Sequence, residues 1–400
     1  VLRNGQFQPI AGPAWNSETA TSQATYNKNN STTTLTNVGN VANIKVGSLV
    51  TGSGVGREVY VRSRNVGAKT VKISRPLYDA QGTQNFTFKR HKYLLDFSGY
   101  DKFSQFVLDD IEFQCEGEAS GVMLAPDGLI FHVRDCFMTK PKNRGITSPG
   151  YGCQGMMIDR CNFVSNEQST KVQDRFTIGF NANANDVKIR DNRVSKFKHF
   201  CVLTGTGTIV TGNHWFHGDD ENDGVRRGGV VITTANCRSI ITGNYIDNNF
   251  IEWTNEHEAS PAFNNQLSFG GLTVTGNVFT SIDVGAGFNY LIVKPYGPNH
   301  FIHGLSVTGN VFRCISGNIN RIEDVDTSFA DLDYTRMRQI DFSANTFHGV
   351  NDPCYNPAFL EHNQSTASDN WTITTDPYLP FRGRARNVEN SIAIEICSCN

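Results

Sequence analysis

The chain has 400 residues, with 36 lysines and arginines against 38 aspartates and glutamates, and its formal net charge is −2. This near neutrality argues against nucleic acid as the main partner, because a surface that tracks phosphates makes a domain basic. The sequence contains no run of 18 apolar residues, so membrane insertion through a transmembrane helix is not expected. Charged residues are only 18% of the chain, while aromatic residues reach 11% and 37 glycines are present. This composition favours an all-β chain with many turns over a disordered one.

The N-terminal part of the chain divides into three segments. Residues 1–20 are predicted as a first strand at the edge of a coil, and because the chain starts with Val1 we expect further residues upstream. Residues 21–36 are rich in Ser, Thr and Asn and are predicted as a linker. The next residues alternate short apolar runs with Gly turns, which predicts a small β module. The linker and this β insertion together span residues 21–91.

A short pattern recurs through the middle of the chain: an apolar residue, any residue, a turn residue, Asn, any residue and an aromatic or apolar residue. The clearest copies are residues 274–279 and 307–312, which both read Val-Thr-Gly-Asn-Val-Phe. The pattern recurs every 21 to 35 residues, and upstream the Asn gives way to Cys or Ile. The nine equivalent positions are Ile111, Cys136, Cys161, Asn192, Asn213, Asn244, Asn277, Asn310 and Asn345.

This unit is too short and too strand-like for helical repeats and predicts a parallel β-solenoid over residues 92–350, with coils about 4.8 Å apart. Stacked Asn side chains are expected to hydrogen-bond along the row, and Cys136 and Cys161 to fill the same inward position as small apolar groups. The ten cysteines form no CxxC pair, so most are expected to be buried free thiols. Residues 351–400 lose the repeat and are predicted as a cap or an oligomerisation segment.

The repeated Thr-Gly-Asn-x-Phe pattern with its Asn ladder resembles the right-handed parallel β-helix of the pectate-lyase-like superfamily, over about residues 95–350. Members of this superfamily include polysaccharide lyases, glycoside hydrolases, sugar epimerases and trimeric bacteriophage tailspikes. The expected fold class is therefore all-β: a right-handed parallel β-helix of about nine or more coils, with a small inserted β module near the N-terminus and an irregular C-terminal cap. The ordered Asn-Thr-Asp, Gly-His-Gly and Arg-Ile-Lys motifs of polygalacturonases are absent, and no pectate-lyase calcium signature is evident.

The resemblance to tailspikes implies a homotrimer that engages a bacterial or algal surface polysaccharide. It also implies an extracellular location, on a phage or phage-like tail or as a secreted protein. Depolymerisation by hydrolysis of glycosidic bonds is the expected activity.

Coils that stack in register place residues at the same offset from the Asn position above one another. Six residues past that position, Glu167 and Asp219 fall two coils apart, at about 9.6 Å, with Lys198 between them. Carboxylates about 6.5–9.5 Å apart are typical of inverting glycosidases. Glu167 and Asp219 are therefore predicted to be the general acid and base.

Two polar segments add further candidates. Residues 217–227 carry four acids beside Arg226, and residues 251–258 combine carboxylates, an imidazole and an exposed-looking Trp, which suits a sugar site. The predicted catalytic residues are Glu167, Asp219, Glu252 and Glu256. The predicted substrate-binding residues are Lys198, Asp174, Arg175, Arg226, Trp253 and His257.

Other functions stay open at this point. A polysaccharide lyase would use Lys198, Arg175 or Arg226 to handle a uronate and its C5 proton. A non-catalytic receptor-binding spike or adhesin would bind the glycan with the same residues without cleaving it. A structural fibre would neither bind nor cleave a glycan. The sequence predicts no cofactor and no metal site; residues 219–223 only faintly resemble a calcium loop, so a structural or catalytic Ca²⁺ is left open without support. Nucleophile elbows and phosphate loops are absent.

Overall fold

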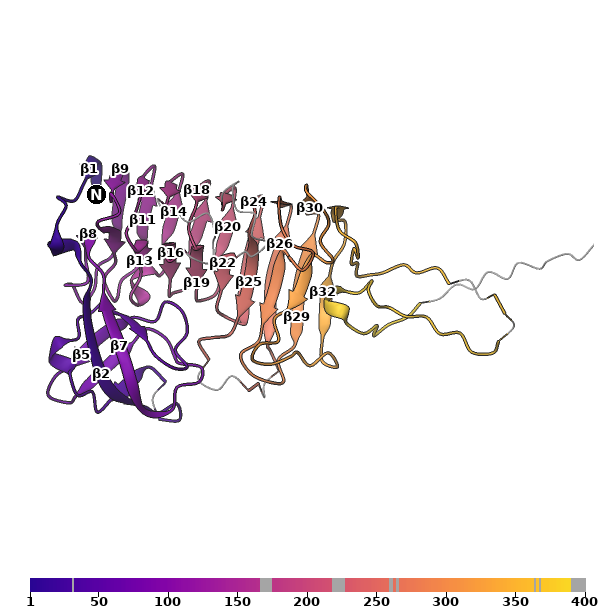
Figure 1. Cartoon of the computed structure of the whole chain (residues 1–400), viewed down its shortest axis with the longest axis horizontal. Helices are drawn as coiled ribbons and strands as arrows, with labels where there is room; N and C mark the ends of the chain where they lie inside the picture. The colour runs from indigo at the N-terminus through magenta and orange to yellow at the C-terminus, as the bar shows by residue number, and fades with distance from the viewer. Residues whose placement is uncertain are drawn as a thin grey trace, which may run out of the picture.

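The computed structural model describes residues 1–30, 32–165, 175–217, 227–258, 262–263, 266–362, 365–366 and 368–389, which are almost entirely β. Outside a small N-terminal β module, their strands pair in parallel from coil to coil along a rod (Figure 1). The chain is therefore a right-handed parallel β-helix, as predicted from the repeat. No described helix is long and apolar enough to cross a membrane.

Each coil contributes one strand to each of three parallel stacks, which we call the flank sheet, the first row and the second row. The flank sheet contains β8 (Tyr93–Asp96), β10 (Ser120–Met123), β13 (Arg144–Thr147), β16 (Ile178–Ala182), β19 (His199–Leu203), β22 (Gly228–Ile232), β25 (Phe250–Thr254), β28 (Leu291–Lys294) and β31 (Glu323–Val325). The first row contains β11 (Phe131–Arg134), β14 (Met157–Asp159), β17 (Lys188–Arg190), β20 (Ile209–Thr211), β23 (Asn236–Thr242), β26 (Phe269–Thr275), β29 (Ile302–Thr308) and β32 (Arg338–Asp341). The second row contains β12 (Phe137–Thr139), β15 (Asn162–Val164), β18 (Arg193–Ser195), β21 (His214–Phe216), β24 (Tyr245–Asp247), β27 (Val278–Ser281), β30 (Val311–Cys314) and β33 (Thr346–His348).

Both rows start from β9 (Phe106–Gln114), and β1 (Leu2–Phe7) pairs in parallel with β9 at the N-terminal end of the rod. Short 3₁₀ helices also occur in the described chain, at Pro13–Trp15, Val41–Asn43, Tyr151–Cys153 and Pro380–Arg382.

The Asn positions form the ladder that the sequence predicts. In each pair of coils from Asn192 to Asn345, the Oδ1 of the later Asn accepts both the backbone N–H and the side-chain amide of the earlier one, at 2.9–3.1 Å. At the upstream end, the backbone N–H of Cys161 donates to Asn192. The eight cysteines in the described chain are buried and free, which confirms the thiol prediction for them. Each buried amide of the turn is thus satisfied by the next coil.

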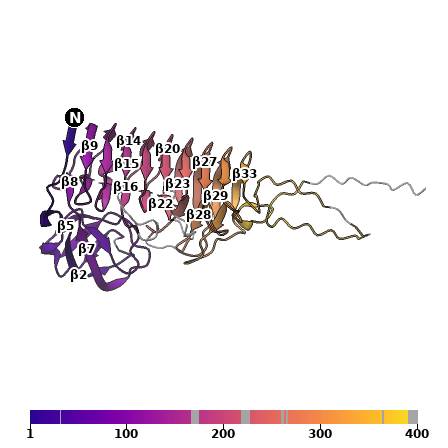
Figure 2. The same ribbon diagram turned by 45° about the horizontal axis from the view of Figure 1, so that its top comes forward.

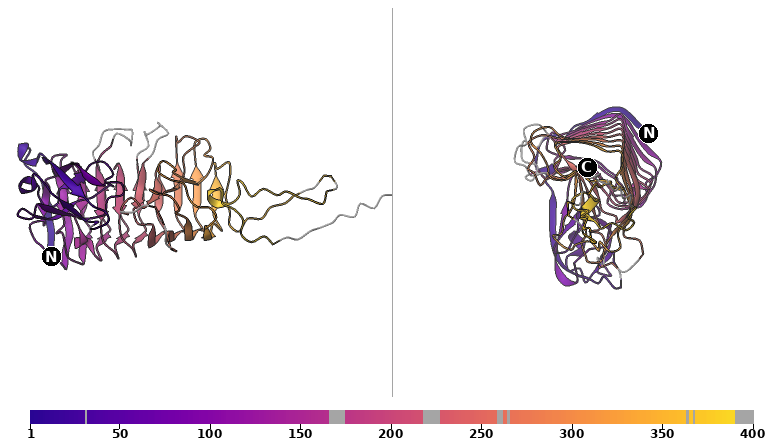
Figure 3. Two further views of the ribbon diagram at one scale, coloured as in Figure 1. Left: turned by 90° about the horizontal axis from the view of Figure 1, so that it is seen from below. Right: turned by 90° about the vertical axis from the view of Figure 1, so that its right-hand side faces the viewer.

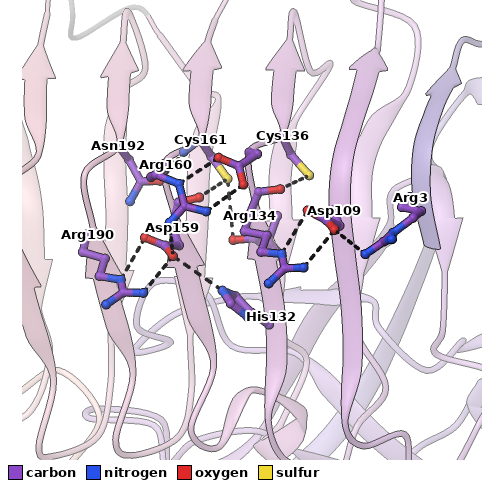
Figure 4. A network of polar contacts seen from close by, with 12 residues as sticks. Arg3, Asp109, His132, Arg134, Cys136, Asp159, Arg160, Cys161, Arg190 and Asn192 are labelled. Carbon is purple, nitrogen blue, oxygen red and sulfur yellow. Dashed lines mark hydrogen bonds and ion pairs between the residues drawn. The ribbon is translucent and has the colours of Figure 1, made fainter. Parts of the chain in front are cut away.

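On the outer face of the first row, charged side chains alternate along the rod (Figure 4). Arg134 forms two hydrogen bonds of 2.9 Å with Asp109 on the preceding coil. Asp159 accepts from Arg160 at 3.0 Å and from Arg190 on the following coil at 2.8 and 2.9 Å. These pairs hold neighbouring coils in register and neutralise the carboxylates on this face.

The β module is an antiparallel sheet of six strands in the order β4-β7-β2-β3-β6-β5, with its own apolar core. Its strands are β2 (Glu18–Tyr26), β3 (Thr34–Thr36), β4 (Leu49–Thr51), β5 (Val61–Asn65), β6 (Thr70–Ile73) and β7 (Gly82–Arg90). The predicted linker over residues 21–36 is wrong, because β2 pairs with β7 along nine residues. Ser22, Ala24 and Tyr26 alternate inward, and this two-residue period was hidden by the polar composition of the segment.

The module lies beside the N-terminal half of the rod, as Figures 2 and 3 show from three directions. At the other end, Glu323 occupies the inward column that Leu291 fills one coil earlier. The backbone N–H of Phe381 donates to the Glu323 carboxylate at 2.9 Å, and Arg321 donates to the carbonyl of Leu379 at 3.0 Å. Residues 379–381 thus return to cover the last coil.

Candidate functional site

The β module and the flank sheet meet along a seam whose centre is Arg57. The Arg57 guanidinium donates to Glu252 at 2.7 and 3.1 Å and to Glu256 at 2.8 Å, and the Arg57 backbone N–H donates to Glu256 at 3.0 Å. The Glu256 side chain is only 2% exposed. Burial alone would raise the pKa of Glu256, but the charge of Arg57 outweighs it and lowers that pKa. Glu256 is therefore held as an anion inside an ion pair.

The neighbouring contacts bring the two backbones close together. A Cβ on Gly56 would lie 2.9 Å from both the Glu256 carbonyl oxygen and the His257 ring, so only glycine fits at this approach. A second ion pair joins the same two parts, because Arg144 of β13 donates to Glu58 of the module at 2.7 and 3.1 Å. The seam is thus a packed interface fastened by two buried ion pairs.

At one end of the seam, three aromatic side chains form a cluster that we call the aromatic platform. Tyr78 belongs to the module, Tyr296 follows β28 and Phe329 follows β31. The rings of Tyr296 and Phe329 stack with centroids 4.3 Å apart, and Tyr78 meets Tyr296 edge-on at 4.7 Å. Phe329 is 50% exposed, and the two tyrosines are half-buried.

Charged groups flank the platform. The Lys294 ammonium lies 5.4 Å from the centre of the Phe329 ring and 2.6 Å from the carboxylate of Asp326. Burial raises the pKa of Tyr78 and of Tyr296, so both phenols stay neutral and act as hydrogen-bonding groups. An exposed aromatic ring beside charged and hydroxyl groups can stack on the apolar face of a sugar ring and hydrogen-bond to its hydroxyl groups.

A third carboxyl group, Glu258, sits in the turn after β25 and connects with the platform through Asn255. The Asn255 amide donates to Glu258 at 3.0 Å, and its Oδ1 accepts the backbone N–H of Tyr296 at 2.7 Å. The Glu258 side chain is 37% exposed, and partial burial raises its pKa. Glu256 and Glu258 are two residues apart, yet their pKa values move in opposite directions.

The structure brings together only part of the predicted site. Glu252, Glu256 and His257 meet at the seam, where burial lowers the pKa of His257 to about 4 and so keeps its ring neutral. Lys198 is half-buried at the entrance to β19, next to His199. Four predicted residues lie outside the described residues: Glu167, Asp174, Asp219 and Arg226.

Two expectations need correction. Trp253 does not offer a face to sugar, because its side chain is fully buried, donates to the carbonyl of Thr234 at 2.9 Å and packs edge-on against Phe269. Trp253 aligns with Ile232 of β22, so it faces the interior of the coil. Arg175 is also buried, and it donates to the backbone carbonyl of His217 at 2.8 Å. Neither side chain can contact a polymer on the surface.

Sequence reasoning missed the residues that complete the seam. Arg57 binds Glu252 across 195 positions, and no local pattern links the two. Tyr296 and Phe329 follow successive flank strands, a signal that stacking the loops by coil could have found. Glu258 lay inside the segment already selected for its polar composition. In the described parts of the chain, no group of three or more His, Cys, Asp and Glu side chains could hold a metal ion.

No protein-family model and no curated protein matches this chain. Several solved structures share features of its fold. A mutant tailspike protein of E. coli bacteriophage HK620, in complex with a pentasaccharide, is 11% identical with a TM-score of 0.42; the match covers 59% of this chain and 45% of that one.

The Gp54 tailspike of Acinetobacter baumannii bacteriophage AP22, in complex with capsular saccharide, is 11% identical with a TM-score of 0.34; the match covers 85% of this chain and 64% of that one. DFA-IIIase from Arthrobacter chlorophenolicus A6 without its lid is 14% identical with a TM-score of 0.31, covering 64% and 71%. This chain spans less than half of the HK620 tailspike chain. Assignment of the parallel β-helix rests on the strand pairing of the chain itself.

Proposed function

We propose that the protein binds a surface polysaccharide at the end of the seam, with the aromatic platform as its main contact. The supporting observation is the platform itself, in which Tyr78, Tyr296 and the half-exposed Phe329 lie together beside Lys294 and Asp326. Aromatic faces stack on the apolar faces of sugar rings, and charged and phenolic groups bond to sugar hydroxyls.

The charges around the platform favour a neutral glycan. Two cations, Arg57 and Lys294, lie beside three carboxylates, Glu252, Glu256 and Asp326, and each cation is already paired. A polyuronate would be repelled by this balance. Among the cleavage reactions, hydrolysis is therefore favoured over a lyase reaction, because a lyase needs a uronate.

Hydrolysis of the bound glycan is the second part of the proposal. The predicted pair Glu167 and Asp219 stays a proposal for the acid and the base. Glu256 is a poor candidate, because it is buried and its charge is taken up by Arg57. Glu252 is the more exposed of the two carboxylates that bind Arg57. We also propose an extracellular location, on a phage tail or as a secreted protein. The proposed homotrimeric state can be tested by light scattering.

A panel of neutral and acidic bacterial and algal surface polysaccharides tests the function. Binding is followed by calorimetry, cleavage by new reducing ends, and lyase products by the ultraviolet absorbance of unsaturated sugars. New reducing ends from a neutral glycan support hydrolysis, and unsaturated products would support the lyase. Binding without products leaves a receptor-binding spike, and no binding by any glycan would overturn the proposal.

A further inference from the structure

The turn after β25 contains a buried series of side-chain hydrogen bonds that ends at Glu258. The Tyr296 N–H donates to Asn255 Oδ1, and this contact fixes the orientation of the Asn255 amide. Its NH₂ group then donates to Glu258 Oε2 at 3.0 Å and to His300 Nε2 at 2.8 Å. The other ring nitrogen of His300, Nδ1, lies 2.6 Å from Ser268 Oγ. Asn255, His300 and Ser268 are all completely buried, whereas Glu258 reaches the surface.

This chain of contacts also fixes the tautomer of His300. Because Nε2 accepts from Asn255, the ring proton lies on Nδ1 and is donated to Ser268. Ser268 accepts a second bond from the backbone N–H of Phe301 at 3.3 Å. The His300 ring packs against Phe263 and Phe269, with centroids 4.9 and 5.3 Å away. His300 therefore supports the Asn255 amide as a hydrogen-bond acceptor, and its Nε2 lies 3.7 Å from Glu258 Oε2, too far for a hydrogen bond.

Glu258 differs from Glu252 and Glu256 in that no Lys or Arg of the described residues pairs with it. Glu252 and Glu256 share Arg57, whereas within the described chain the only side-chain hydrogen bond to Glu258 comes from the neutral amide of Asn255. Partial burial without a cation favours the protonated carboxyl group, in agreement with the raised pKa of Glu258. Glycosidases place two neighbouring carboxyl groups in contrasting environments, so that one stays protonated as the acid while the other is an anion.

We infer that Glu258, held by Asn255, is the general acid for a glycan bound on the aromatic platform. This inference rests on the proposed function. The Glu258 carboxyl gives its proton to the glycosidic oxygen as the C–O bond breaks and its electron pair passes to that oxygen. Water adds to the anomeric carbon and releases a proton to the solvent, so Glu258 takes the acid role in place of Glu167 or Asp219. Asn255, with His300 and Ser268 behind it, is a positioning residue.

The test starts from a glycan that the wild-type protein cleaves. We expect Glu258→Gln to lower kcat by about 100-fold or more, with glycan affinity and thermal stability unchanged. Glu116→Gln, at an exposed carboxylate elsewhere on the rod, is the matched control and should keep full activity. Full activity of Glu258→Gln would overturn the inference and leave the proposed function standing.

Asn255→Ala tests whether Asn255 sets the pKa of Glu258. A purely structural role of Asn255 would leave the pH–rate profile unchanged. The amide of Asn255 lowers the pKa of Glu258, so its removal should shift the alkaline limb of the pH–rate profile to higher pH. Should that variant fail to fold, Ser268→Ala loosens the same chain from its buried end, and we expect a smaller decrease of kcat with unchanged affinity. Infrared difference spectra of wild type against Glu258→Gln test the protonation directly, without any glycan. A Glu258 that titrates like a free glutamate overturns the inference alone, whereas a wild-type protein that cleaves no glycan overturns the inference together with the hydrolysis proposal.

Discussion

The guanidinium of Arg57 lies 2.7 Å from the carboxylate of Glu252, although 195 residues separate them in the sequence. With Glu256 as second acceptor, Arg57 fastens the β module to the flank sheet. Arg57→Ala leaves Glu256 buried without a counter-charge, and we expect it to lower the free energy of unfolding by about 3 kcal/mol or more. Denaturant unfolding measures this loss.

Arg3→Ala is the matched control for that experiment. Arg3 also donates to a carboxylate, Asp109 at 3.1 Å, but its side chain is 60% exposed. Exposed pairs contribute about 0.2–1 kcal/mol, so the control should lose far less stability. Equal losses in the two variants would contradict the fastening role of Arg57.

The aromatic platform gives a prediction about binding. Phe329→Ala removes the most exposed ring of the cluster, and we expect the affinity for a bound glycan to fall by about tenfold. Because Phe329 is half-exposed, the melting temperature should change little. Calorimetric titration gives the affinity, and Phe359→Ala, a change at an almost fully exposed ring on the C-terminal segment, is the control. Unchanged affinity in Phe329→Ala would remove the platform from the binding site.

The Asn ladder gives a prediction about stability. Asn277→Ala leaves the backbone N–H of Asn244 without its acceptor and removes the bonds that the Asn277 amide makes to Asn310 and Ile241. We expect a loss of about 2–4 kcal/mol in the free energy of unfolding, because each buried group left unpaired costs about 1–3 kcal/mol. Thr273→Ala, on the outer face of the same coil, should lose less than about 1 kcal/mol. A loss of similar size in both variants would show that the ladder contributes no special stability.

The period of the repeat could be predicted because every coil meets the same physical demand. A turn residue that stacks on its equivalent must satisfy its own amide, and this demand selects Asn at position after position, as in Asn244, Asn277 and Asn310. The positions of the strands and of their inward-facing residues follow from the same repeat. The nine-residue polar strand β2 escaped prediction because its inward residues include Ser22 and Ala24, which carry little apolar signal.

The site was predicted less well, because its key contacts join segments that no local pattern relates. Trp253 was selected for its residue type, but its place in the register directs it into the core. Glu256 was selected as a carboxylate, but its partner Arg57 comes from the other side of the seam. Composition thus located the polar turn after β25, while burial and long-range pairing decide which of its side chains can act.

Three buried histidines predict how stability depends on pH. Burial lowers the pKa of His199 to about 3, that of His257 to about 4 and that of His91 to about 3, against an ordinary value of 6.5. Between pH 6.5 and 5 the folded chain keeps these rings neutral, while the unfolded chain takes up protons. The unfolded state then binds more protons, so the free energy of unfolding falls as the pH falls, by up to about 1.4 kcal/mol per pH unit for each ring.

Denaturant unfolding at a series of pH values across this window measures the slope. We expect His257→Gln to reduce the slope by the contribution of about one proton, because a glutamine takes up none in either state. His348→Gln changes an exposed ring and is the matched control. The window lies above the range in which Glu256 titrates, so its ion pair with Arg57 does not contribute to the change. A slope that is the same in His257→Gln as in the wild-type protein would mean that the His257 ring accepts a proton in the folded chain, contrary to its burial.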